Sequence, residues 1–127
     1  MKYVVTTDKD VDTVCSEMET VVPAHQFGIV AVHDLQETMQ KKGVEFDKAV
    51  KVFEICNPKK AKAVLEKDMD LAIALPCRIA VYEDNGQTKI SMMAPAAMLK
   101  ALNPDPELEV IALAVESSFK AMMDQLK

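Results

Sequence analysis

The chain has 127 residues, a length that fits one domain, and half of its residues are hydrophobic. That share can build one core that hides roughly two-thirds of the unfolded surface. The formal net charge is −5, and the only dense group of lysines, within residues 59–67, is followed by acidic residues. Nucleic-acid binding requires clustered Lys and Arg side chains, so the charge pattern argues against it.

Hydropathy and cysteine content point to a cytoplasmic protein. No apolar run approaches the ~18–20 residues of a membrane span, and residues 1–8 lack the apolar core of a signal peptide. We therefore expect a soluble, cytoplasmic chain with no membrane partner. Its three cysteines are then expected to be free or part of a site, because disulfide frameworks are rare in reducing compartments.

The first half of the chain predicts two strand–helix pairs. Residues 2–6 read as a strand, and Thr7 or Asp8 can cap a helix that Pro23 closes. The buried stripe of this helix is spaced by three and four residues: Val11, Val14, Cys15, Met18, Val21 and Val22. Residues 27–32 form a second predicted strand. Asp34 and Glu37 then match a capping box, and Gly43 ends the second helix.

The second half predicts a third strand at Val50 to Cys56, followed at once by a helix. Asn57 is a favoured N-cap, and Pro58 suits the first helical turn. Residues 71–81 alternate like a strand, although Pro76 marks an edge, a bulge or a break in it.

The end of the chain predicts a hairpin and two helices. Asn85-Gly86 predicts a tight turn that sets Val81 opposite Ile90. Helices are expected from Pro95 and over 106–126. The order of elements predicts a single α+β domain over residues 1–127, with helices on one face of a largely antiparallel sheet.

The candidate site lies around Cys56, which directly precedes a predicted helix start. The positive end of a helix dipole favours a thiolate there, whereas Glu54 on the same strand face opposes it. If Phe53 and Ile55 fill the core, Cys56 is on the less buried side. If Val50 and Val52 fill the core instead, Cys56 is a core sulfur and Glu54 needs a partner.

Cys77 and His33 complete the set of candidates. The hairpin register places Cys77 with Ile79 and Val81 on the apolar face, which favours a buried structural thiol. His33 ends the second strand, where a structural hydrogen bond is the ordinary role. If His33, Cys56 and Cys77 converged, they would supply three ligands suited to zinc, copper(I) or haem iron. No metal-binding spacing supports this convergence, and no cofactor can be specified.

Signatures of common enzymes are missing. There is no glycine-rich phosphate loop, G-x-S-x-G elbow or H-E-x-x-H pair. Whether the protein is an enzyme is therefore left open.

Several short pieces, in one order, resemble a known family. These are Phe27-Gly28-Ile29-Val30, His33-Asp34-Leu35, Lys42-Gly43-Val44-Glu45-Phe46, Cys56-Asn57-Pro58 with Ala61, Leu75-Pro76-Cys77 and Val81-Tyr82-Glu83. The chain resembles the bacterial and archaeal domain of unknown function 302. The resemblance implies a compact α+β domain with an antiparallel sheet and a homodimer. It implies no activity, substrate or catalytic residue.

Three hypotheses about function follow. The first is a module that binds a small molecule or metal in a pocket near His33, Glu54, Cys56 and Cys77. The second is a structural homodimer without a ligand, whose subunit contact uses the methionine-rich final third: Met92, Met93, Met98, Met122 and Met123. The third is a thiol-dependent enzyme with Cys56 as nucleophile and His33 as base. We favour the first.

Overall fold

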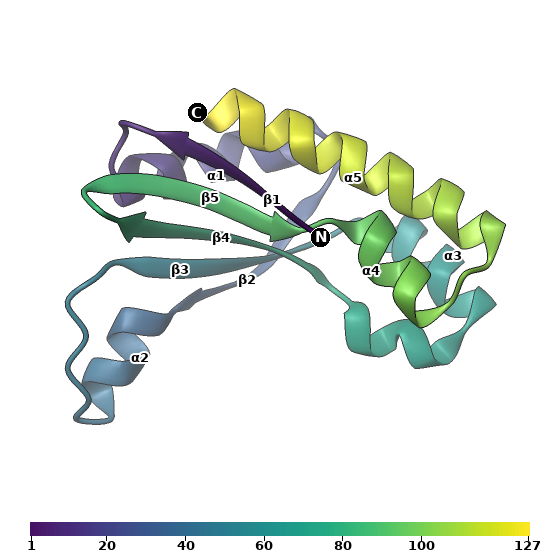
Figure 1. The fold of residues 1–127 in the computed structure, drawn as a ribbon, viewed down its shortest axis with the longest axis horizontal. Coiled ribbons are helices and arrows are strands. Elements are labelled where there is room, and N and C mark those ends of the chain that lie inside the picture. The colour runs from purple at the N-terminus through teal and green to yellow at the C-terminus, as the bar shows by residue number, and fades with distance from the viewer.

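A computed structural model describes residues 1–127 as one five-stranded antiparallel sheet flanked by helices (Figure 1). The strands are β1 (Lys2–Thr7), β2 (Gly28–Asp34), β3 (Val50–Cys56), β4 (Cys77–Asp84) and β5 (Gln87–Met93). They lie in the order β1-β5-β4-β3-β2, and each neighbouring pair is antiparallel. The predicted α+β class with a largely antiparallel sheet is confirmed.

Five α-helices and one 3-10 helix accompany the sheet. They are α1 (Val11–Ala24), α2 (Leu35–Lys41), α3 (Pro58–Lys67), η1 (Met69–Ala74), α4 (Pro95–Leu102) and α5 (Pro106–Leu126). Helices α1 and α5 pack on one face of the sheet, and α3, η1 and α4 gather around the first half of α5. In Figure 1 the strands lie between α5 and α2. None of these helices combines the length and apolarity that crossing a bilayer requires.

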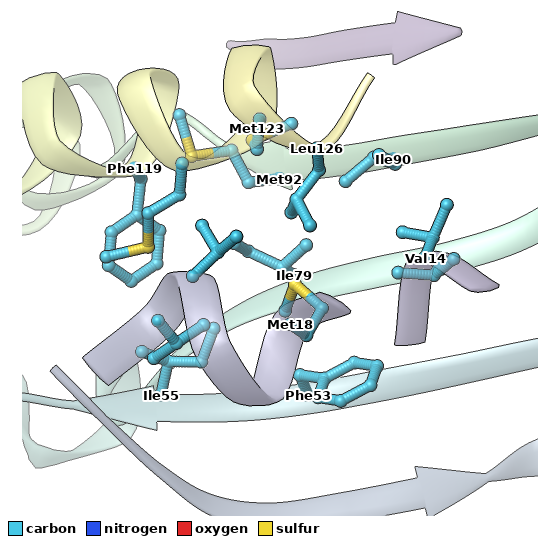
Figure 2. Close-up of a cluster of buried hydrophobic side chains, with 14 of the residues drawn as sticks. Val14, Met18, Phe53, Ile55, Ile79, Ile90, Met92, Phe119, Met123 and Leu126 are labelled. Atoms are coloured by element: carbon cyan, nitrogen blue, oxygen red, sulfur yellow. The ribbon is translucent and has the colours of Figure 1, made fainter. Parts of the chain in front are cut away.

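The main core lies between the sheet and the helices α1 and α5. Every strand residue that is buried points to this side: Val5, Thr7, Phe53, Ile55, Ile79, Val81, Thr88, Ile90 and Met92. Figure 2 shows Phe119, Met123 and Leu126 of α5 above these strand residues, with Val14 and Met18 contributed by α1. The opposite face of the sheet contains no buried residue. The sheet is therefore covered on one side only.

A second, smaller core holds the remaining helices. Its buried members are Val64, Leu71, Leu99, Leu108 and Ala112, from α3, η1, α4 and α5. Because α5 is 21 residues long, it contributes to both cores and joins the sheet layer to the helical end of the molecule.

Helix starts follow the predicted capping chemistry, with one shift. The side chain of Asp34 accepts a hydrogen bond from the backbone N–H of Glu37 at 2.9 Å, which confirms the predicted cap of α2. The cap of α1 is Asp10, not Thr7 or Asp8, because β1 runs through Thr7. Pro23 lies in the last turn of α1 and the helix reaches Ala24.

The long strand predicted over residues 71–81 is wrong in its first half. Residues 69–74 form η1, and the Leu75–Pro76 peptide bond is cis. Pro76 has no N–H to donate to a ladder, so the strand begins at Cys77. The alternating apolar residues before Pro76 do not share one environment: Leu71 is buried in the second core, Leu75 packs against it, and Ile73 is 79% exposed.

The predicted hairpin is confirmed. Asn85 and Gly86 both have positive φ angles, of 53° and 77°, and Val81 lies opposite Ile90.

The late methionines belong mainly to the core of one chain. Met92, Met122 and Met123 are buried in the main core of a single chain, so they are not free to meet a partner. Of the others, Met98 is partly buried and Met93 is 54% exposed.

Candidate functional site

Two cysteines meet at one end of the sheet. Cys56 is the last residue of β3, and Cys77 is the first residue of β4. The two strands are antiparallel, and Ile55 lies directly opposite Cys77. The end of β3 and the start of β4 therefore lie next to each other.

Both cysteines line one apolar pocket, which we call the cysteine pocket. It lies between the end of the sheet, the start of α3, and α4 and α5. Its lining consists of Phe27, Ile55, Cys56, Asn57, Lys60, Ala61, Val64, Leu75, Pro76, Cys77, Pro95, Leu99, Ile111, Ala112 and Val115. The hollow has a volume of about 40 Å³. The cysteine pocket is therefore small and almost wholly apolar.

The two thiols have different surroundings. Phe53 and Ile55 fill the core, so Cys56 is on the less buried side of β3 and stays partly exposed. Burial raises the pKa of the Cys77 thiol to about 11, and the nearby Cys56 adds to the rise while Arg78 opposes it. Cys77 therefore stays protonated at neutral pH.

Polar groups are confined to one end of the pocket, where α3 begins. The side chain of Asn57 accepts from the backbone N–H of Lys60 at 3.1 Å. The amide of Asn57 donates to the carbonyl oxygen of Gln26 at 3.1 Å, which ties the start of α3 to the turn before β2. Lys60 takes part in none of the ion pairs of the structure. The pocket thus has an uncompensated cation at its rim.

His33 and Glu54 form a separate cluster on the uncovered face of the sheet. His33 Nε2 lies 2.7 Å from Glu54 Oε1, and Arg78 Nη2 lies 3.4 Å from Glu54 Oε2. The hydrogen bond with His33 lowers the pKa of Glu54, and the positive charge of Arg78 acts in the same direction. Glu54 is therefore an ionised, partnered carboxylate.

The structure does not bring His33 together with Cys56 and Cys77. His33 pairs with Val52, four residues before Cys56 along β3, which amounts to roughly 13 Å at the usual rise per residue. No group of three or more His, Cys, Asp or Glu side chains is placed to hold a metal ion. The third cysteine, Cys15, is buried in the stripe of α1 as predicted.

Comparison with known proteins identifies the family. The model for "Domain of unknown function DUF302" matches residues 3–126. The chain belongs to the DUF302 family. A crystal structure described as "uncharacterized conserved protein DUF302 from Bacillus stearothermophilus" is 31% identical to this DUF302 chain. The match covers 99% of this chain and 98% of that one, with a TM-score of 0.92. The search of curated proteins found no match.

Sequence reasoning missed most of the lining of this DUF302 pocket. Nothing in the sequence marks Leu75, Pro95, Ile111 and Val115 as pocket residues, because the pocket closes between elements distant in the chain. Arg78 follows Cys77 in β4 and therefore lies on the opposite face of the sheet. Its role as a partner of Glu54 follows from their cross-strand pairing.

Proposed function

We propose that this DUF302 protein is a binding module for a small molecule with a slender aliphatic tail and an anionic head. The tail occupies the cysteine pocket, and Lys60 meets the head. The observation that carries the proposal is a narrow apolar hollow with two thiols inside and one unpaired lysine at its rim. Ligand sites are commonly apolar clefts with a few polar groups that orient the ligand.

The dimensions of the pocket select the ligand class. The cavity volume of about 40 Å³ corresponds to roughly three water-sized spheres. This space suits the first few carbons of an alkyl tail and excludes a nucleotide or a fused ring system. The partly buried thiol of Cys77 contributes to an apolar wall, because a protonated thiol packs as a small hydrophobe.

The preference for a ligand with an anionic head follows from the residues at the end of the pocket where α3 begins. Lys60 has no carboxylate partner in the chain, and the positive end of the α3 dipole favours negative charge. A carboxylate head on the aliphatic tail satisfies both features.

The alternative hypothesis, an enzyme with Cys56 as nucleophile, lacks a general base to activate the thiol. His33 was the only candidate, and its imidazole is held by Glu54 on the uncovered face of the sheet. We therefore do not propose a nucleophilic reaction.

The test uses octanoate as the probe, titrated into the full-length protein by calorimetry. We expect saturable binding that Ala61→Leu weakens by about 10-fold or more, because the added carbons occupy the hollow. Ala97→Leu, on an exposed position of α4 outside the pocket, is the matched control. Lys60→Gln should weaken octanoate binding and leave octanol binding unchanged, whereas Lys59→Gln should alter neither.

Protection of Cys56 gives a second readout. Bound octanoate should slow alkylation of Cys56 by iodoacetamide in the wild type and not in Ala61→Leu. Absence of saturable binding, or equal affinity in wild type and Ala61→Leu, would overturn the proposal.

A further inference from the structure

A second apolar hollow lies beside the cysteine pocket, and the proposed function leaves it without a role. It has a volume of about 240 Å³, against about 40 Å³ for the cysteine pocket. It lies at the end of the sheet where β5 runs into α4 (Figure 1). We call it the methionine hollow, and its lining includes Ile73, Ala74, Cys77, Met93, Met98 and Phe119.

The two hollows share one wall. Pro76, Cys77 and Pro95 line both of them. The two proline rings are rigid, whereas the thiol of Cys77 is small and turns about a single side-chain bond. Cys77 is therefore the most adaptable part of the wall, and an alkyl chain that crosses from one hollow to the other passes its side chain.

The volumes of the two hollows show how an aliphatic tail would divide between them. The cysteine pocket corresponds to roughly three water-sized spheres, whereas the methionine hollow corresponds to roughly twenty. The tail of octanoate is longer than the cysteine pocket can hold. Its distal carbons therefore need a second apolar space, and the methionine hollow is the space that adjoins the pocket.

The walls of the methionine hollow suit a flexible alkyl chain. Met93 and Met98 have unbranched, polarizable side chains that adapt to ligands of varied shape. Ile73 is 79% exposed and Met93 is 54% exposed, so part of this apolar wall faces water in the free chain. A tail that lies against these side chains removes apolar surface from water, which stabilises the complex.

The charges at the two hollows orient the ligand. Arg78 is the one charged residue that lines the methionine hollow, and its Nη2 already lies 3.4 Å from Glu54 Oε2. Lys60, at the rim of the cysteine pocket, takes part in no ion pair. An anionic head is therefore better compensated at Lys60, and the tail extends from there toward the methionine hollow.

We propose that the methionine hollow receives the distal carbons of the ligand tail, which reaches it past Cys77. The protein then binds octanoate and longer acids more tightly than hexanoate, because only the longer tails reach this hollow. This inference rests on the proposed function, which places the head and the first carbons of the ligand in the cysteine pocket.

A series of acids of increasing length tests the proposal by calorimetry on the full-length protein. From hexanoate to octanoate and on to decanoate, we expect the affinity of the wild type to rise about 16-fold at each step, or about 4-fold per buried CH₂. Ala74→Leu places extra carbons in the methionine hollow, so it should abolish this rise and leave hexanoate binding unchanged. Ala72→Leu, at an exposed position of η1 that lines neither hollow, is the matched control and should keep the rise. Circular dichroism confirms that each variant is folded.

Oxidation of methionine by hydrogen peroxide gives a second readout that needs no substitution. Saturating decanoate should slow the oxidation of Met93 in the wild type, and saturating hexanoate should not. Met69 is the internal control, because it is 70% exposed and lines neither hollow, so its rate should be the same throughout. Peptide mass spectrometry measures both rates.

The outcomes separate this inference from the proposed function. Equal affinity of the wild type for hexanoate, octanoate and decanoate would overturn the inference and leave the cysteine pocket as the binding site. A folded Ala74→Leu that keeps the wild-type rise, or decanoate that leaves Met93 unprotected, would do the same. A wild type that binds none of the three acids would overturn the proposed function itself.

Discussion

At the scale of single residues, exposure and pKa distinguish the three cysteines. Burial raises the pKa of Cys15 and of Cys77 to about 11, from an ordinary value of 9.0. Cys56 is partly exposed at the end of β3. Reactivity follows the thiolate and its access to solvent, so the three thiols should differ in rate.

We predict that iodoacetamide modifies Cys56 first at pH 8, with Cys15 and Cys77 far slower. With a pKa of about 11, roughly one thiol in 1,000 is ionised at that pH. The rates at both sites should climb as pH rises from about 9 toward about 11. Over the same range these thiols lose their contribution to stability, because the unfolded thiols ionise before the folded ones. Peptide mass spectrometry after timed quenching gives the three rates.

Denatured protein is the control, since all three thiols should then react alike. Alkylation of Cys77 at the rate of Cys56 in the folded protein would contradict the prediction.

At the scale of elements, the junction between β3 and α3 sets the cysteine pocket in place. A single residue, Asn57, caps the helix and also ties it to the turn before β2. Pro58 follows as the first helical residue. The strand end and the helix start are thereby held as one rigid corner.

We predict that Asn57→Ala lowers the free energy of unfolding by about 0.5–2 kcal/mol, because α3 loses its cap. Asn57→Asp keeps the accepting oxygen and loses only the donor to Gln26, so its loss should be smaller. Urea unfolding followed by circular dichroism measures both. Equal losses in the two variants would show that the bond to Gln26, and not the cap, is what stabilises the corner.

At the scale of the whole molecule, α5 joins the two cores. Its second half packs on the sheet, where the ring of Phe119 meets that of Phe27 edge to face at 5.2 Å between centroids. Its first half supplies Leu108 and Ala112 to the smaller core. The helical layer and the sheet layer should therefore unfold together.

We predict that Phe119→Ala lowers the free energy of unfolding by about 3–5 kcal/mol, because it opens a cavity in a fully buried site. Leu113→Ala on the same helix is the control. The Leu113 side chain is 48% exposed, so this substitution should change the free energy of unfolding by no more than about 0.5 kcal/mol. Chemical denaturation monitored at two wavelengths would also reveal whether the two cores separate, and two distinct transitions would contradict a joint unfolding.

The features that could be predicted from the sequence are local. The cap at Asp34, the helix start at Asn57-Pro58 and the turn at Asn85-Gly86 depend on hydrogen bonds and φ angles within a few residues. Such interactions depend on residues that are close in the sequence, so the spacing of residue types predicts them. The order of these local elements predicted the α+β class, and short matching stretches of sequence indicated the family.

Contacts between distant residues could not be predicted from the sequence. The buried face of β3, the approach of Cys56 to Cys77, and the pairing of His33 with Glu54 depend on strand register between distant segments. The alternation before Pro76 misled because burial against helices and burial in a sheet give similar apolar patterns. Contacts across the chain are selected by the packing of all elements together, and no short stretch of sequence contains that information.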